Sequence, residues 1–185
     1  MPKAGLSRER VVDIALELGR SGPPASLGAV ARAAGVRTPS LYKHVESASE
    51  LSSLVAERAL TRFADVLRSE IGSAEGPAAA EEFLHAYRRF ATSDPHLFSL
   101  IPIQPGNDPR LRPIAQRLMH DLATALGFSG LSSPDALHAL RFLRAVADGF
   151  VRLELAGGFG EPTSVSESWD HIVEAASTSP VVFPS

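Results

Sequence analysis

The segment GVRTPSLYKHV, residues 35–45, gathers polar and stacking side chains on a very short piece of chain. Six of them fall between positions 37 and 44, namely Arg37, Thr38, Ser40, Tyr42, Lys43 and His44. Guanidinium and ammonium groups bind phosphate or the acceptor edge of guanine, and hydroxyl groups donate to phosphates or bases. Apolar and ring surfaces such as those of Pro39 and Tyr42 pack on thymine methyl groups or sugars. These residue types indicate a surface that contacts DNA.

Two predicted helices precede this segment. Ser7 comes before RERVVDIALELGRSG, in which Val11, Ile14, Ala15 and Leu18 recur at helical spacing and Gly19 and Gly22 follow. Ser26 is a plausible N-cap for LGAVARAAG, and Gly35 would end that helix in the left-handed conformation. Ser26 also lies where helix N–H groups and the helix dipole favour a phosphate.

A short third helix and a long fourth one follow. Thr38 is predicted to cap the third helix with Pro39 in its first position, and Leu41 and Val45 face inward. Ser47 and Glu50 have the spacing of a capping box, so a fourth helix should run from there to about Ile71. Helix two, a glycine-containing turn and helix three then form a helix-turn-helix, whose second helix lies in the major groove.

The rest of the chain is also predicted to be helical. Helical runs cover AAAEEFLHAYRRFATS, DPHLF, RPIAQRLMHDLATALGF, SSPDALHALRFLRAVADGFVRLELAGG and a stretch from Glu167 to about Ser177. The fold class is therefore all-α, with about nine helices. We expect a helix-turn-helix DNA-binding domain over residues 1–50 and a second helical domain over 51–185, linked by the helix at about 47–71.

Charge divides the chain in the same way. Residues 1–62 hold nine Lys and Arg against six Asp and Glu, and the remainder holds nine against fifteen. The mildly basic first part fits a nucleic-acid partner, whereas statistical scatter would explain so modest an excess equally well. The chain has no Cys, no apolar run long enough to span a membrane and no signal-peptide core in its first twenty residues, so we expect a cytoplasmic protein.

The N-terminal motifs resemble those of TetR-family transcriptional regulators. The resemblance rests on VVDIALELG, SLGAVARAAGV and PSLYKHV followed by SASELSSLV, and covers Arg8 to about Leu60. AYRRFATSDPHLFSL and LRFLRAVADGFVRLELAGGFG resemble the regulatory domain of one large branch of the family. The resemblance implies that residues 51–185 form an effector-binding and dimerisation domain. It also implies a homodimer that binds a palindromic double-stranded DNA operator, is usually a repressor and is released by a small-molecule effector.

The chain departs from the family pattern at several positions. Gly28 stands where a basic residue is common, and Ala48 stands where a phosphate-binding Lys is usual. Arg144 and the pair Asp148–Gly149 stand where the branch often has Trp and His-Gly. The first two departures leave an alternative open, in which the protein is a helical dimer that binds a ligand or another protein and has weak or lost DNA binding.

The C-terminal part offers candidates for the effector and for the dimer interface. Tyr87, Phe90 and Phe98 could line a ligand cavity or be ordinary core, and Arg144 and Asp148 could contact the ligand or pair with each other. The helix Asp135–Leu155 is apolar on more than one face and could form a four-helix interface with its counterpart. The predicted interface residues are Leu140, Leu143, Ala147, Phe150, Trp169, Ile172 and Val173.

Other chemistries have little support in the sequence. The six His residues form no three-ligand set at metal-like spacing, so no metal is expected. No Ser lies in a glycine-flanked elbow and no glycine-rich phosphate loop follows a strand, so neither an enzyme nor a bound cofactor is expected.

Overall fold

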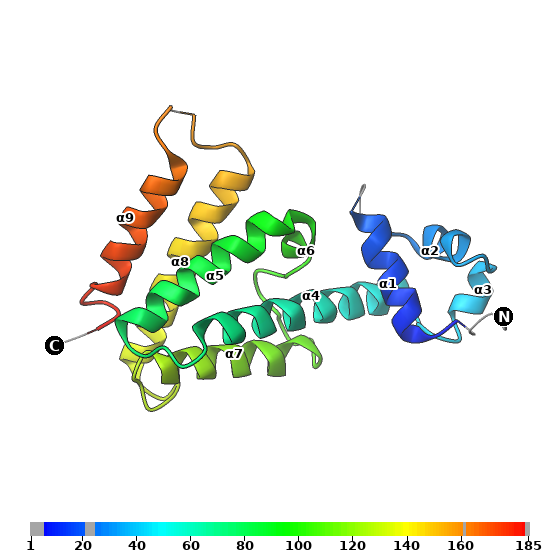
Figure 1. Cartoon of the computed structure of the whole chain (residues 1–185). Coiled ribbons are helices and arrows are strands. Elements are labelled where there is room, and N and C mark those ends of the chain that lie inside the picture. The colour runs from blue at the N-terminus through cyan, green and yellow to red at the C-terminus, as the bar shows by residue number, and fades with distance from the viewer. Residues whose placement is uncertain (1–5, 21–24, 161, 184–185) are drawn as a thin grey trace. The chain divides into compact units, whose positions relative to one another are not determined.

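The computed structural model describes residues 6–20, 25–160 and 162–183, and all regular structure in these ranges is helical. This confirms the predicted all-α class. In chain order the helices are α1 (Arg8–Gly19), α2 (Leu27–Ala33), α3 (Thr38–Leu41), α4 (Ala48–Ile71), α5 (Pro77–Ser93), α6 (Pro95–Ser99), α7 (Leu111–Ala125), α8 (Pro134–Leu155) and α9 (Val165–Ser177), as Figure 1 shows. Of the predicted residues, Gly22 lies outside the described ranges.

The chain packs as two compact units. The first unit comprises residues 1–61 and 96–112, and the second comprises residues 62–95 and 113–185. The first unit is discontinuous because most of α6 and the loop after it pack with the N-terminal helices, which no local pattern indicates. A functional division at residues 50 and 51 stays a prediction.

The first unit is held together by a small apolar core. Its buried members come from the first four helices and the turn after α3, namely Val11, Val12, Ile14, Ala15, Val30, Ala31, Leu41, Val45 and Leu51. The Ser7 and Ser26 hydroxyls cap α1 and α2 by accepting from the N–H groups of Arg10 and Ala29, both at 3.2 Å. The Ser26 cap agrees with the sequence-based prediction, and both caps satisfy helix donors that would otherwise lack a partner.

Two predicted helix starts need correction. Helix α3 begins at Thr38, and its N-cap is Arg37, whose carbonyl accepts from the Ser40 N–H at 2.8 Å. Thr38 is therefore already helical, and the Arg37 side chain makes no capping hydrogen bond. Helix α9 begins at Val165, two residues before the predicted start, because the Ser164 hydroxyl caps it by accepting from the Glu167 N–H.

The second unit is built around α5, which packs against α8 and α9. Its buried face includes Phe83, Tyr87 and Phe90, and Phe63 of α4 makes edge contacts with the last two rings at centroid distances of 5.0 and 5.1 Å. Trp169 of α9 is buried beside Phe150 of α8. Within the described ranges, no helix is long and apolar enough to cross a membrane.

Candidate nucleic-acid interface

A tight turn joins α2 to α3. Gly35 has a φ of 69°, a left-handed conformation that costs glycine little. The Gly35 N–H donates to the Arg32 carbonyl and the Val36 N–H donates to the Ala31 carbonyl, at 3.1 and 3.0 Å. These two bonds form a Schellman motif, which satisfies the last carbonyl groups of α2 and reverses the chain. The predicted role of Gly35 is confirmed.

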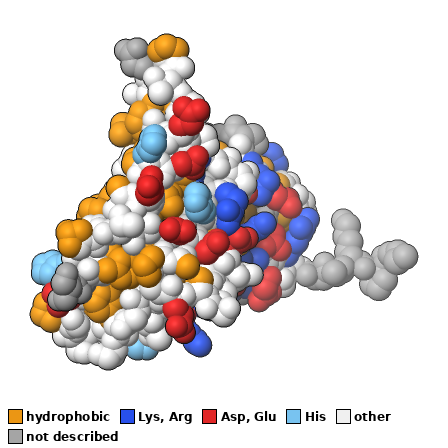
Figure 2. All heavy atoms as spheres, turned by 60° about the vertical axis from the view of Figure 1, so that its left-hand side comes forward, with side chains coloured by type: hydrophobic (Ala, Val, Ile, Leu, Met, Phe, Trp, Pro, Cys, Tyr) orange, Lys and Arg blue, Asp and Glu red, His pale blue; other side chains and the backbone are white. Residues whose placement is uncertain are grey.

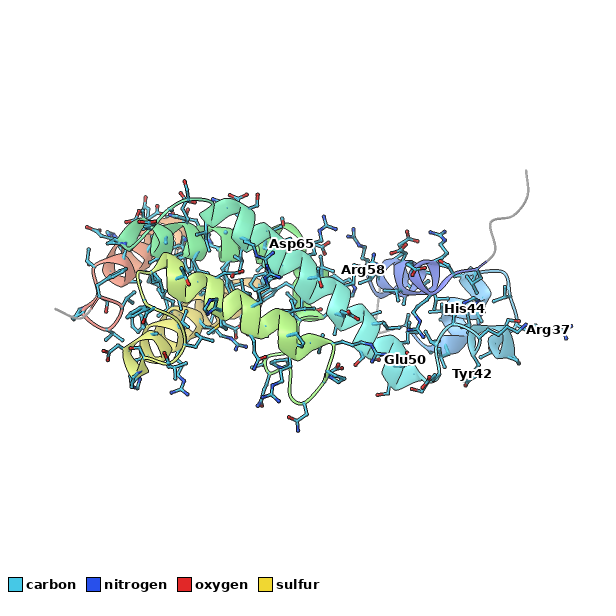
Figure 3. All side chains as sticks on the ribbon, turned by 90° about the horizontal axis from the view of Figure 1, so that it is seen from below. Arg37, Tyr42, His44, Glu50, Arg58 and Asp65 are labelled. Atoms are coloured by element: carbon cyan, nitrogen blue, oxygen red, sulfur yellow. The ribbon has the colours of Figure 1, made fainter. Side chains whose placement is uncertain are left out.

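Helix α3 divides its side chains between the core and the solvent. Leu41 and Val45 are buried, as predicted, whereas Tyr42 next to them is 54% exposed. That exposure excludes the alternative that Tyr42 is an ordinary core aromatic. Figure 3 shows Arg37 and Tyr42 pointing outward from this short helix.

The two cations of the predicted DNA surface are available to a ligand. Arg37 and Lys43 are exposed, and neither forms an ion pair with any residue that the structure describes. Pro39 is exposed and Thr38, Ser40 and His44 are half-buried, all on or directly after α3, while Ser26 is exposed at the start of α2. The local geometry thus brings the eight predicted DNA contacts onto two adjacent helix starts and one turn. Their contact with DNA remains a prediction.

Arg8 binds the turn that follows α3. Its Nε donates to the His44 carbonyl at 2.9 Å, and its Nη2 lies 3.5 Å from the Glu50 carboxylate. Carbonyl groups at a helix end lack partners within the helix, and a cation is favourable there. The segment after α3 is therefore tied to the first turn of α1.

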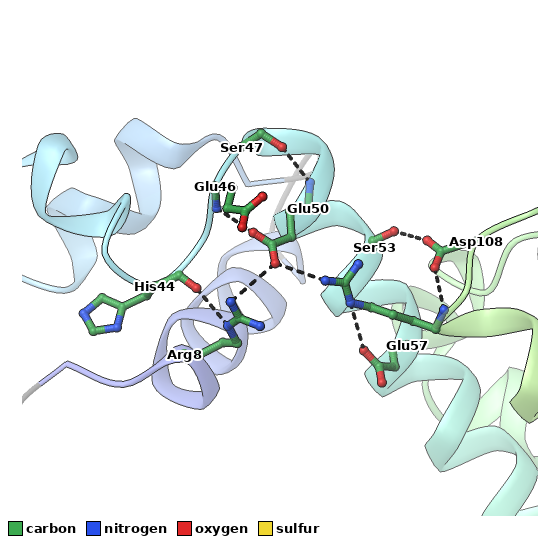
Figure 4. Close-up of polar contacts among 9 residues, drawn as sticks. Arg8, His44, Glu46, Ser47, Glu50, Ser53, Glu57 and Asp108 are labelled. Atoms are coloured by element: carbon green, nitrogen blue, oxygen red, sulfur yellow. Dashed lines mark hydrogen bonds and ion pairs between the residues drawn. The ribbon is translucent and has the colours of Figure 1, made fainter.

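Glu50 is the centre of a polar network that the sequence indicated only in part (Figure 4). The Ser47 hydroxyl accepts from the Glu50 N–H at 3.0 Å, which confirms one half of the predicted capping box. The Glu50 carboxylate does not complete the box at Ser47; it reaches one residue further back and accepts from the N–H of Glu46 at 2.5 Å. The same carboxylate, only 11% exposed, also accepts from Arg110 at 3.1 Å. Arg110 lies sixty residues away, so no local pattern could have found it.

The loop before α7 contributes a second contact to α4. The Ser53 hydroxyl donates to the Asp108 carboxylate, and the Arg110 backbone N–H donates to the same carboxylate at 2.8 Å. The Ser53 hydroxyl is the main cause that lowers the pKa of Asp108, and the Arg110 N–H adds to it. Asp108 is therefore ionised at neutral pH, and its carboxylate accepts both hydrogen bonds.

The predicted effector residues divide between the two units. Phe98 is buried in the first unit, whereas Tyr87, Phe90, Arg144 and Asp148 belong to the second. In the second unit the Tyr87 hydroxyl donates to Asp148 at 2.8 Å, across from α5 to α8. Tyr87 and Phe90 also pack against Phe63, so both are core aromatics whatever else they contact. Effector binding by these residues stays a prediction.

Asp148 is an anion held in a half-buried place. Burial acts to raise its pKa, but hydrogen bonds from Arg152 and Tyr87 and the charges of Arg152 and Arg144 outweigh it, so the pKa is lowered. The Arg152 Nε donates to the Asp148 carboxylate at 2.6 Å, from a position four residues further along α8. Burial first, and then the charge of Asp148, raises the pKa of Tyr87, which keeps the phenol a hydrogen-bond donor.

Most of the residues predicted for a dimer interface pack inside the single chain. Leu140, Leu143, Ala147, Trp169 and Val173 are buried without any partner chain, because α8 and α9 turn this face toward α5. Phe150 is buried as well, and together with the half-buried Ile172 it borders an apolar groove. The groove is lined by Phe142, Val146, Phe150, Leu153, Phe159, Ile172, Ala175 and Ala176. Figure 2 views the molecule from the α9 side and shows hydrophobic side chains gathered on this surface.

The described part of the chain contains no group of three His, Asp or Glu side chains close enough to hold a metal ion. The polar clusters at Glu50 and Asp148 are instead pairs of carboxylates with arginines.

Comparison with protein families matches residues 80–176 to the tetracyclin repressor-like C-terminal domain. An uncharacterized HTH-type transcriptional regulator of Mycobacterium tuberculosis, Rv0681, is 30% identical over 83% of this chain and 72% of its own length. Another such regulator, YobS of Bacillus subtilis, is 28% identical over 90% of this chain and 88% of its own length.

Solved structures show the same fold. The putative regulatory protein SCO4313 superposes with a TM-score of 0.75 at 26% identity, covering 91% of this chain and 94% of its own. A TetR variant from Acinetobacter baumannii in complex with minocycline superposes with a TM-score of 0.68 at 19% identity, covering 98% of this chain and 99% of its own. Both similarities extend over nearly the whole chain.

Proposed function

Because this chain belongs to the TetR family of transcriptional regulators, we propose that it is a repressor that binds a palindromic operator as a homodimer and releases it when a small molecule binds. The observation that carries the proposal is the division of side chains in α3 and the turn after it. Leu41 and Val45 are buried, whereas Tyr42 and Lys43, which lie between them, are exposed. A helix anchored in this way presents its polar side to the major groove of DNA. A regulator of this kind acts in the cytoplasm, because its DNA target lies there.

The exposed groove on α8 and α9 is the proposed dimer surface, in place of the buried residues predicted from the sequence. It contains large apolar side chains at the surface, including Leu153 and Phe159. A contiguous exposed apolar patch marks an interaction surface, and a second copy of the chain meets it through the same residues about a two-fold axis. A dimer then presents two copies of α3 to successive major grooves of a palindrome.

The second unit is the proposed effector domain. Residues 80–176 match the regulatory domain of the family, and one structural neighbour was solved with minocycline bound. In this chain the Tyr87–Asp148 hydrogen bond lies beside Phe63 and Phe90 and offers polar groups within an aromatic surrounding. Linkage requires that an effector which weakens operator binding is itself bound more weakly, by the same factor, when DNA is present.

The direct test is selection of bound duplexes from a random DNA pool by the purified protein at moderate salt. Enrichment of a palindrome supports the proposal, and its half-site spacing reports the dimer geometry. Tyr42→Ala and Lys43→Ala should each weaken binding to that palindrome while the protein stays folded. If a folded dimer enriches no sequence, DNA reading is lost and the alternative of a ligand-binding or protein-binding dimer takes its place, with Gly28 and Ala48 as its motivation.

A further inference from the structure

We infer that Arg110, which lies outside the helix-turn-helix, is a positioning residue for operator binding: it holds α3 in its DNA-reading orientation through Glu50 and Arg8. The inference rests on the proposed function, because the position of α3 matters only if α3 reads DNA. All the residues that carry it belong to the first compact unit. Figure 4 shows the contacts.

The chain of contacts starts in the loop before α7. Arg110 donates from Nη2 to Glu50 at 3.1 Å and places Nε 3.9 Å from Glu57. Asp108, two residues earlier, accepts from the Ser53 hydroxyl. Positions 50, 53 and 57 are three and four residues apart, so they share one face of α4. The loop is thus fastened along two turns of α4 by three separate side chains.

Glu50 connects this loop to Arg8 and to the turn that follows α3. One carboxylate oxygen, Oε1, meets both Arg110 and Arg8, while Oε2 accepts from the N–H of Glu46. The carboxylate is largely buried, so solvent screens these contacts less than it would at an open surface. Removal of Arg110 leaves Glu46, Glu50 and Glu57 with Arg8 as the remaining cation of the cluster. The Glu50 carboxylate then loses its contact with the loop before α7.

Arg8 makes the last step. Its Nε donates to the His44 carbonyl at 2.9 Å, directly after the residues that would contact DNA. Helix α3 comprises only Thr38–Leu41, so it has almost no hydrogen-bond ladder of its own. Its orientation depends on the buried Leu41 and Val45 and on what holds its C-terminal end. When Arg8 shifts, the end of α3 loses its polar anchor and the DNA-contacting side chains become less ordered.

The test compares Arg110→Gln with a matched control, Arg112→Gln. Arg112 is an arginine in the same region, exposed and without an ion pair to any described residue. On the palindrome selected above, Arg110→Gln should bind about 2- to 30-fold more weakly than the wild type, the range typical of residues that act through others. Arg112→Gln should bind as the wild type does. Loss of a direct phosphate contact would reduce the magnitude of the salt slope of log K by about 0.9, whereas Arg110→Gln should leave that slope unchanged.

A second readout needs no DNA. The N–H groups of His44 and Val45 donate to the Leu41 carbonyl, and their hydrogen exchange reports how often the end of α3 opens. In the dimer without DNA we expect faster exchange at these amides in Arg110→Gln and not in Arg112→Gln. In a Glu50→Gln background the change Arg110→Gln should have little further effect on exchange or affinity, because both substitutions break the same contact.

The two proposals fail differently. If the wild type binds no duplex, the proposed function fails, and the exchange comparison still decides whether Arg110 orders α3. If the wild type binds its operator but Arg110→Gln matches Arg112→Gln in both affinity and exchange, the inference is wrong and the function stands. A full effect of Arg110→Gln in the Glu50→Gln background, or a salt slope reduced as for a phosphate contact, would equally overturn it.

Discussion

The imidazole of His96 occupies the place where a side chain on Gly19 would stand: a Cβ on Gly19 would lie 2.8 Å from both Cε1 and Nε2 of His96. Gly19 is the last residue of α1, and its backbone is not in the left-handed region. Packing, and not backbone conformation, therefore requires glycine here. The pair brings α6 against the end of α1 within the first unit.

This contact predicts that the effect of Gly19→Ala depends on residue 96. In the wild type the new methyl group should force the His96 ring aside and lower the free energy of unfolding by about 1–3 kcal/mol, as overpacking does. In an His96→Ala background the clash is gone, and the better helix former should stabilise the protein by about 0.5–1 kcal/mol. Urea unfolding of the four proteins measures both values. The same sign in both backgrounds would contradict the packing argument.

Leu41 and Tyr42 are neighbours in the chain, but their substitution by Ala should affect stability very differently. Leu41→Ala empties a fully buried site and should lower the free energy of unfolding of the first unit by about 2–5 kcal/mol. Tyr42→Ala removes a ring that is mostly in solvent and should change stability by no more than about 0.5 kcal/mol. Thermal or urea unfolding with a probe in the first unit separates the two. A large loss of stability for Tyr42→Ala would mean that this ring is part of the core.

The proposed dimer surface predicts that a charge at Leu153 separates the protomers. Leu153 is 52% exposed and lines the apolar groove, so Leu153→Glu would bury an unpaired carboxylate in a dimer. The matched control is Leu155→Glu, since Leu155 is 39% exposed on the same helix and does not line the groove. Sedimentation velocity should show a monomer for the first variant and a dimer for the second. A dimer that survives Leu153→Glu would place the interface elsewhere.

Asp148 predicts a pH dependence of stability in the second unit. Its pKa is lowered from the ordinary value of 3.8, so the ionised form is favoured in the folded protein. The contribution to stability is therefore complete well above pH 3.8 and is lost as the pH falls below that value, through the lower pKa of the folded state. Asp148→Asn should cost about 1–2 kcal/mol near neutral pH, since the carboxylate is only partly buried.

Urea unfolding of wild type and Asp148→Asn across the pH range isolates this group, because other carboxylates titrate in both proteins. The difference between the two should stay constant near neutral pH and narrow only in acid. Tyr87→Phe, which removes one of the hydrogen bonds to Asp148, should lose part of the same stability. A difference that narrows well above pH 3.8 would show that the pKa is not lowered.

The helix-turn-helix was predictable because its determinants are close together in the chain. Ser26, Gly35 and the buried positions Leu41 and Val45 act through bonds and spacings of three to six residues, and the structure bears out each of them. The start of α3 was wrong by one residue, because both Arg37 and Thr38 can precede a proline-containing first turn. Such local choices depend on small differences in backbone geometry.

The side of α8 and α9 that faces inward was not predictable. Both helices are apolar over more than one face, so periodicity identifies the helices but does not say which apolar face meets α5. Trp169 and Leu143 were assigned to a dimer surface and are buried in the chain, whereas Leu153 and Phe159 remain exposed. Only the packing of three helices decides between two faces of similar hydrophobicity.

By itself, therefore, the sequence determined the helical class, the Ser26 cap and the helix-turn-helix, because each depends on residues within one or two turns of one another. The tertiary structure decided which long-range partners meet. Arg110 reaches Glu50 and Tyr87 reaches Asp148 across about sixty residues. Neither pair has a sequence signal, because charged and polar side chains find such partners only after the apolar faces have chosen how the helices pack.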